Sequence, residues 1–417
     1  MIVFKGAPPV DRSHVPFPGT WGVPVKYIQK GELKMSQNAL PNQFENFADA
    51  RKQGFLAVKN LKDAGKKVAG VFCTYAPVEI MLAANAVPVG ICAFSDETIP
   101  EAEKVLPRNL CPLVKSSYGF AVTEKCPYIF FSDLIIGETT CDGKKKMYEL
   151  LSDIKKVHIM QLPQTQNNEA SKELWHKEVL LLKEKIEKEF GVTISAENIK
   201  KAIKIKNEER KLLKEFYELS KACPPPITGA EQLKILYGSQ FKFDYEVKNR
   251  ELRTVIDKIK QDYANGVGNV SKTAKRILIT GCPLAGVTEK VVTAIEQSGG
   301  VVVAYENCIG VKPAERLVDE NAEPYKALAD RYLKIGCSVM TPDNYRYETI
   351  SNLVKEFKVD GVVEMTLQAC HTYAIETNQV RKLLQKENIP FISVETDYST
   401  ADAAQLKLRI EAFIEML

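Results

Sequence analysis

Ten cysteines are the residues of this 417-residue sequence best suited to redox or metal chemistry. They stand at positions 73, 92, 111, 126, 141, 223, 282, 308, 337 and 370, and no two of them form a CxxC pair. Close cysteine pairs are typical of zinc fingers and zinc ribbons, and stable disulfides need an oxidising compartment. A single cysteine is most often a small buried apolar residue, so the positions of these ten decide whether they carry chemistry.

Five of the cysteines fall at or just past the ends of predicted β-strands. These are Cys73, Cys141, Cys282, Cys308 and Cys370. Ligands of open parallel sheets bind outside the carboxyl ends of the strands. We therefore expect thiols from two facing sheets to converge on one metal cluster. Scattered thiolates suit an iron–sulfur cluster better than zinc, because iron–sulfur clusters are held mainly by cysteines whose order in the sequence varies.

Short apolar strands alternate with amphipathic helices in both halves of the sequence. The first half places strands at 67–72, 87–91, 134–140 and 157–162, and the second half at 276–280, 301–305, 360–366 and 390–394. This alternation predicts an α/β fold with two Rossmann-like (flavodoxin-like) parallel-sheet domains that face each other across a cleft. The similar order of strands and cysteines in the two halves suggests a diverged duplication.

The composition along the chain divides it into four predicted segments. A proline-rich arm and a helix occupy 1–65, and the first α/β domain occupies 66–165. A charged, helix-periodic connector follows at 166–270, with Ser195 as a predicted helix cap. The second α/β domain occupies 271–417.

Charge and hydropathy exclude several classes of function. Lys and Arg number 57 against 53 Asp and Glu, and the resulting net charge of +4 gives no indication of a nucleic-acid-binding surface. The longest apolar run, 80–94, is shorter than the ~18 residues of a spanning helix, and the N-terminus lacks the pattern of a secretion signal. We therefore expect a cytoplasmic protein with reduced thiols.

A few other polar residues are candidates for chemistry. His371 follows a candidate ligand and Glu306 ends a predicted strand, so we consider both as catalytic proton donors or relays. The Lys144–Lys146 run opens a predicted helix, where cations oppose the helix dipole, and is expected to be a solvated face. The glycine-rich stretches lack the spacing of a phosphate loop or a dinucleotide site, so no nucleotide-binding motif is found.

Several segments resemble the 2-hydroxyacyl-CoA dehydratase/benzoyl-CoA reductase superfamily. They are Phe72–Pro77, Asn109–Ser117, Thr139–Lys145, Gln368–Tyr373, Glu395–Asp397 and Arg409–Phe413. Within the superfamily, Glu138–Tyr148 and Tyr305–Cys308 are most similar to the double-cubane cluster proteins.

The resemblance implies a set of cluster ligands. Dehydratase subunits hold one [4Fe-4S] cluster through three cysteines, which match Cys73, Cys111 and Cys370. A double-cubane [8Fe-9S] cluster takes six, and the resemblance extends the set to Cys126, Cys308 and Cys337. Cys141 and Cys282 remain in reserve.

The same resemblance implies a function. It is the reduction of small unsaturated molecules by a homodimer, with low-potential electrons from a separate ATP-hydrolysing iron–sulfur protein. One alternative is a subunit of a 2-hydroxyacyl-CoA dehydratase, a lyase with a single [4Fe-4S] cluster. Another is a non-enzymatic protein that closes two lobes on a small ligand.

Overall fold

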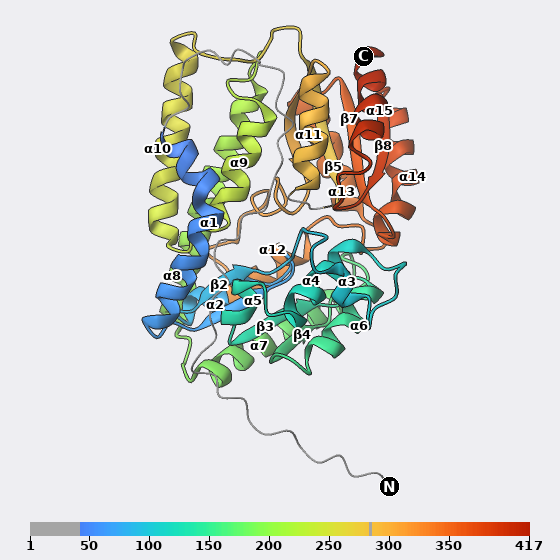
Figure 1. The fold of residues 1–417 in the computed structure, drawn as a ribbon. Helices are drawn as coiled ribbons and strands as arrows, with labels where there is room; N and C mark the ends of the chain where they lie inside the picture. The colour runs from blue at the N-terminus through green and yellow to red at the C-terminus, as the bar shows by residue number, and fades with distance from the viewer. Residues whose placement is uncertain (1–41, 283–285) are drawn as a thin grey trace. The chain divides into compact units, whose positions relative to one another are not determined.

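Two four-stranded parallel sheets, one from each half of the chain, form the framework of the protein (Figure 1). The computed structural model describes residues 42–282 and 286–417. The N-terminal sheet has the order β2-β1-β3-β4, built from β1 (Val68–Val71), β2 (Val87–Gly90), β3 (Leu134–Glu138) and β4 (Val157–Met160). The C-terminal sheet has the order β6-β5-β7-β8, built from β5 (Lys275–Gly281), β6 (Gly300–Glu306), β7 (Gly361–Leu367) and β8 (Phe391–Thr396). The predicted α/β fold with two parallel-sheet units is confirmed, and the shared strand order is that of flavodoxin-like folds.

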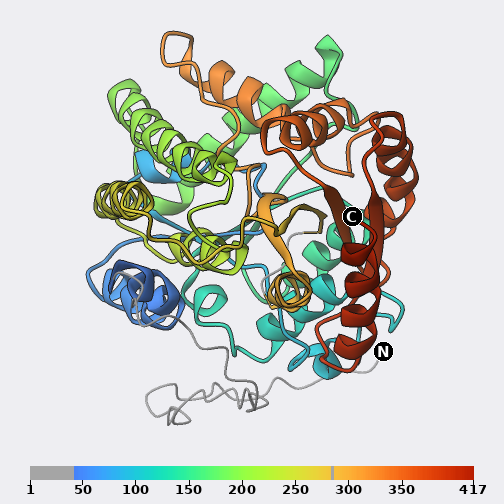
Figure 2. The same cartoon turned by 90° about the horizontal axis from the view of Figure 1, so that it is seen from above.

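Helices cover both faces of each sheet, because every strand interior of a parallel sheet is apolar on both sides. Around the N-terminal sheet lie α2 (Val78–Ala83), α3 (Ile99–Ala102), α4 (Pro112–Val122), α5 (Pro127–Phe131) and α6 (Asp142–Leu151). Around the C-terminal sheet lie α11 (Val287–Gln297), α13 (Asn344–Glu356), α14 (His371–Lys386) and α15 (Ala403–Glu415), whereas α12 (Pro324–Leu333) packs on α7 (Glu169–Phe190) in the core of the N-terminal sheet. Figure 2 shows α14 and α15 beside the C-terminal sheet, where α15 packs on α11 and α14 packs on β7, β8 and α13.

The part of the chain between β4 and β5 is helical, as the sequence predicts. It contains α7 (Glu169–Phe190), α8 (Ala196–Glu218), the 3₁₀ turn η1 (Leu219–Lys221), α9 (Gly229–Ser239) and α10 (Tyr245–Ala264). Ser195 caps α8, since its Oγ accepts a hydrogen bond from the Asn198 amide at 3.1 Å. Helix α8 packs on α2 and α10, and α1 (Asn42–Asp63) packs on α9, so these helices join the surroundings of both sheets.

Residues 40–417 form one compact unit, and the four predicted segment boundaries stay predictions. The predicted proline-rich arm lies outside the described residues, while the helix predicted after it is α1. No helix in the described part of the chain is long and apolar enough to cross a membrane.

Candidate metal centre

Three thiols from distant parts of the chain meet in what we call the Cys111 group, formed by Cys111, Cys282 and Cys370. Cys370 hydrogen-bonds with both of the other thiols. These bonds lower the pKa of the Cys370 thiol well below its usual value, and the bond to Cys370 raises the pKa of Cys111. Burial raises the pKa of Cys282. The three sulfur atoms therefore lie close together.

The local fold directs each of these thiols to that point. Cys111 and Cys370 occupy the N-cap positions of α4 and α14, where the positive end of a helix favours a thiolate. Cys282 follows β5 directly, and its amide donates a hydrogen bond to the Met365 carbonyl at 2.8 Å. Its Sγ accepts a hydrogen bond from the Leu367 amide at 3.4 Å.

The position before Cys282 requires glycine. Gly281 has a φ of +113°, a backbone conformation that residues with a Cβ rarely adopt. A Cβ at this residue would lie 2.1 Å from the Met365 carbonyl oxygen. Gly281 therefore lets β5 approach β7 closely enough to hold Cys282 beside Cys370.

A second set of thiols forms the Cys73 group, consisting of Cys73, Cys308 and Cys337. Each lies within electrostatic range of the other two. The Thr74 hydroxyl donates to Cys308 Sγ at 3.9 Å, and Cys337 Sγ lies 3.8 Å from the Tyr373 hydroxyl oxygen. Burial raises the pKa of Cys73 well above its usual value and raises that of Cys337 to about 11.

The two groups are neighbours. Cys92, just after β2, lies within electrostatic range of Cys308 in the Cys73 group. The phenol of Tyr398 lies within range of Cys92 and of all three thiols of the Cys111 group. Among the described residues, the buried hydroxyl of Tyr398 has no hydrogen-bond partner. Each group takes one thiol from the N-terminal half of the chain and two from the C-terminal half.

Buried ion pairs surround the C-terminal side of the Cys73 group. Lys312 Nζ lies 3.0 Å from Glu306 Oε1 and donates to the Tyr373 hydroxyl at 3.0 Å. Arg346 lies 3.1 Å from Glu306 and also pairs with two more carboxylates, those of Glu364 and Glu376. Burial disfavours the Glu306 carboxylate, but Lys312 and Arg346 outweigh burial and lower its pKa. Glu306 is thus an ionised anchor of two cations, and its predicted role in proton transfer stays a prediction.

A buried cation also lies on the N-terminal side. Lys144, in the first turn of α6, lies within electrostatic range of Cys73 and Cys92, and its ammonium is 5.5 Å from the centre of the Phe72 ring. Glu138, at the end of β3, is fully buried, and burial raises its pKa to about 8.

The solvated face expected at 144–146 is confirmed for two of its three lysines. Lys145 and Lys146 are exposed and pair with Asp142 and Glu149 of the same helix. Lys144 instead points inward with only 8% of its surface exposed, so the expectation is wrong for this residue. The physical reason is that α6 packs the side of its first turn that carries Lys144 against the thiol-bearing strand ends.

The structure brings together five of the six predicted ligands. These are Cys73, Cys111, Cys308, Cys337 and Cys370, and the sixth thiol in the two groups is Cys282. Cys126 lies at the N-cap of α5 and packs against apolar side chains around the N-terminal sheet. Cys141 is the half-buried N-cap of α6, and His371 is an exposed residue directly after Cys370.

Three polar residues of the centre were missed by sequence reasoning. Lys312, Arg346 and Tyr398 are separated from the cysteine motifs in sequence. Only the fold brings Lys312 and Tyr398 to the thiols and Arg346 to Glu306. A partial signal existed for Lys312, which interrupts an apolar stretch four residues after Cys308. Arg346 and Tyr398 lie in ordinary polar surroundings and carry no comparable signal.

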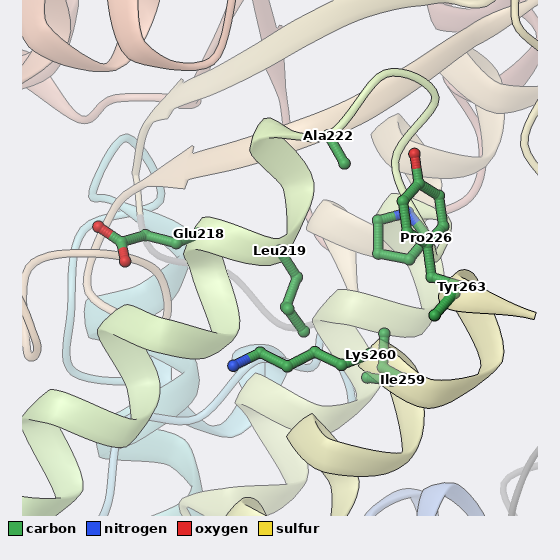
Figure 3. A pocket seen from close by; sticks show the side chains of 8 residues that line it. Glu218, Leu219, Ala222, Pro226, Ile259, Lys260 and Tyr263 are labelled. Atoms are coloured by element: carbon green, nitrogen blue, oxygen red, sulfur yellow. The ribbon is translucent and has the colours of Figure 1, made fainter.

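The thiol groups differ from a site for a single metal ion. In the described part of the chain, no three Cys, His, Asp or Glu side chains could together hold one ion. A cluster places each cysteine on a separate iron, and its ligands need not meet so tightly. A pocket shown in Figure 3 differs from the thiol groups in its lining, because Leu219, Ala222, Pro226 and Tyr263 line it and no cysteine does.

Comparison with known proteins identifies the family. The family described as "2-hydroxyglutaryl-CoA dehydratase, D-component" matches residues 73–417. The chain is 51% identical over 379 residues to the protein named "Putative dehydratase subunit YjiM" of Escherichia coli (strain K12). The matched region covers 91% of this chain and 98% of that protein. The chain belongs to this dehydratase family.

More distant relatives have more varied names. The chain is 25% identical to the "(R)-phenyllactyl-CoA dehydratase beta subunit" of Clostridium sporogenes, over 90% of this chain and 98% of that protein. It is 21% identical to a benzoyl-CoA reductase subunit of Thauera aromatica, over 81% of this chain and 88% of that protein. Proteins named as dehydratase subunits and as a reductase subunit are therefore similar to most of this chain.

Proposed function

We propose that this protein is an iron–sulfur reductase that holds a double-cubane [8Fe-9S] cluster in its two thiol groups. The observation that carries the proposal is the division of six cysteines into two neighbouring sets of three. One set is Cys73, Cys308 and Cys337, and the other is Cys111, Cys282 and Cys370. Each set of three thiolates would hold one cubane of such a cluster. When bound, such a cluster supplies low-potential electrons that can be stored and released in succession.

The chain's own residues fit an anionic cluster. All six thiols are partly or fully buried, which limits access of water and oxygen. Cys111 and Cys370 stand at helix N-termini, and the buried cations Lys144 and Lys312 lie within electrostatic range of the Cys73 group. Thr74 and Tyr373 place hydroxyls near Cys308 and Cys337, and hydrogen bonds to cluster sulfurs raise the reduction potential.

This ligand set replaces one predicted residue. The hydrogen-bonded contact of Cys282 with Cys370 supports Cys282 as the sixth ligand, the place that sequence reasoning assigned to Cys126. His371, exposed beside Cys370, stays a candidate proton donor for substrate.

We propose the same partners that the family resemblance implies. A separate ATP-hydrolysing iron–sulfur protein would supply the electrons, since the sequence lacks a nucleotide motif of its own. The substrates would be small unsaturated molecules, and the protein would act as a homodimer in the cytoplasm.

A second candidate is a dehydratase subunit with one [4Fe-4S] cluster, and the names of the relatives favour it. Its expected ligands are Cys73, Cys111 and Cys370. In the fold, Cys73 belongs to one thiol group and the other two belong to the second group, which supports the two-cubane interpretation.

Anaerobic purification followed by iron and acid-labile sulfide analysis separates the two candidates. We expect about eight iron atoms per chain, against about four for a single cubane. About four would favour the dehydratase, and a chain without iron would overturn both proposals.

Serine variants test the ligand set. Cys282→Ser should lower the iron content, whereas Cys126→Ser and the exposed control Cys223→Ser should keep the iron content of the unmodified protein. Iron loss in Cys126→Ser together with full iron in Cys282→Ser would reverse the assignment of the sixth ligand.

A further inference from the structure

Lys144 is a buried cation without an ionic partner in the described part of the chain. Its side chain is 8% exposed, and within residues 42–282 and 286–417 no carboxylate lies within 4.0 Å of its ammonium. The contact the structure gives it is the face of the Phe72 ring. A buried charge of this kind is strongly unfavourable unless an opposite charge compensates it.

The position of Lys144 in its helix adds to this cost. It lies in the first turn of α6, where the helix dipole is already positive and disfavours a cation. Lys145 and Lys146 on the same helix do not carry this cost, because both are exposed to solvent and paired with carboxylates. Lys144 is held inward instead, within electrostatic range of Cys73 and Cys92.

Two buried cations of the C-terminal side, Lys312 and Arg346, form a useful contrast. Lys312 is paired with Glu306 at 3.0 Å, and Arg346 is paired with three carboxylates. Their charges are balanced by the protein itself. On the side of Lys144, the carboxyl group within electrostatic range is that of Glu138, which lies beyond ion-pair distance and whose pKa burial raises to about 8, so that most of it is protonated at neutral pH.

We propose that the counter-charge of Lys144 is the anionic cluster bound at Cys73, and that this lysine raises the cluster's reduction potential. A fixed cation beside a cluster stabilises the reduced form, which carries one more negative charge. Lys144 would compensate the negative charge of the cluster, and this charge increases with each electron that the cluster accepts. The inference rests on the proposed function, because it requires a cluster in the Cys73 group.

The test compares the iron-loaded protein with three of its variants by potentiometric titration followed by electron paramagnetic resonance. Lys144→Met removes the charge and keeps an apolar stem. Lys146→Met makes the same charge change on the exposed side of the same helix. Lys144→Arg keeps the charge in place.

We expect Lys144→Met to lower the equilibrium constant of the first one-electron reduction at least tenfold, which is about 59 mV toward more negative potential. Lys146→Met should shift the potential by much less, since water screens its charge. Lys144→Arg should stay near the potential of the unmodified protein. Equal shifts in Lys144→Met and Lys146→Met would overturn the inference.

Iron analysis covers the case in which Lys144→Met does not hold its cluster. Loss of iron in Lys144→Met with full iron in Lys144→Arg supports the inference, because charge alone then decides retention. Equal loss in both variants contradicts it, because a steric effect then explains the loss. Absence of iron from the unmodified protein would instead overturn the proposed function, so the two failures are distinguishable.

A double variant tests whether Glu138 is the true partner. If Glu138 balances Lys144, removing both in Lys144→Met/Glu138→Gln should restore the potential of the unmodified protein, and this result would overturn the inference. We expect the double variant to keep the negative shift of Lys144→Met.

Discussion

The two sheets have the same strand order but contribute unequally to the candidate centre. The C-terminal half supplies four of the six grouped thiols, and three of these follow strands β5, β6 and β7. The N-terminal half supplies Cys73 after β1 and Cys111 at the start of α4. Cys92 and Cys141 follow β2 and β3 and belong to neither group. A shared framework thus does not preserve the same ligand positions.

The buried cations beside the Cys73 group also differ between the two halves. Lys312 and Arg346 of the C-terminal half are paired with carboxylates, whereas Lys144 of the N-terminal half has no close acid among the described residues. The charges of Lys312 and Arg346 therefore stabilise the fold, and the charge of Lys144 lies beside the thiols without a carboxylate to balance it.

Arg346→Met should destabilise the protein most. The guanidinium is fully buried and is paired with Glu306, Glu364 and Glu376, so its removal leaves buried carboxylates without their cation. Loss of one partner of a buried pair costs about 3–5 kcal/mol. Urea unfolding measures the change, and Arg250→Met, on an exposed position of α10, is the control. A decrease of less than about 1 kcal/mol in the free energy of unfolding would contradict a structural role for this network.

Gly281→Ala should be nearly as harmful. The new methyl group would combine a positive φ, which costs about 1–2 kcal/mol, with overlap on the Met365 carbonyl, which costs about 1–3 kcal/mol. The corresponding position before Cys73 is Phe72, which has a side chain and shows that the N-terminal sheet does not need this close approach. Melting temperature and iron content should both fall, and an unchanged protein would show that β5 and β7 tolerate separation.

The free energy of unfolding should depend on pH through Glu296, a residue of α11 on the C-terminal side. Burial raises its pKa from 4.5 to about 7, while its Oε1 accepts a hydrogen bond from the Gly229 amide at 2.6 Å. Between these values the folded state binds more protons than the unfolded state, so stability decreases as pH rises from 4.5 to 7, by about 2–3 kcal/mol. Glu296→Gln should lose this dependence, and an identical pH profile in both proteins would contradict the assignment.

The fold was largely predictable, because the eight apolar strand segments are short, separated and followed by helical patterns. Their predicted ranges agree with the observed strands to within two residues at every end. The grouping of thiols was less accessible, since the end of a predicted strand marks Cys282 as a candidate but only the pairing of β5 with β7 brings it to Cys370. The inward position of Lys144 was also unpredictable, because it depends on which side of α6 packs against the sheet.

His158 should give the opposite pH dependence on the N-terminal side. It lies on the edge strand β4, and burial, together with Lys185, lowers its pKa from 6.5 to about 4. The unfolded state therefore binds the proton first, and stability falls as pH decreases from 6.5 to 4. The partial exposure of the ring limits the effect to about 1 kcal/mol. Urea unfolding of His158→Gln across this range should show a flatter profile than the unmodified protein, and a steeper one would reverse the sign assigned to this residue.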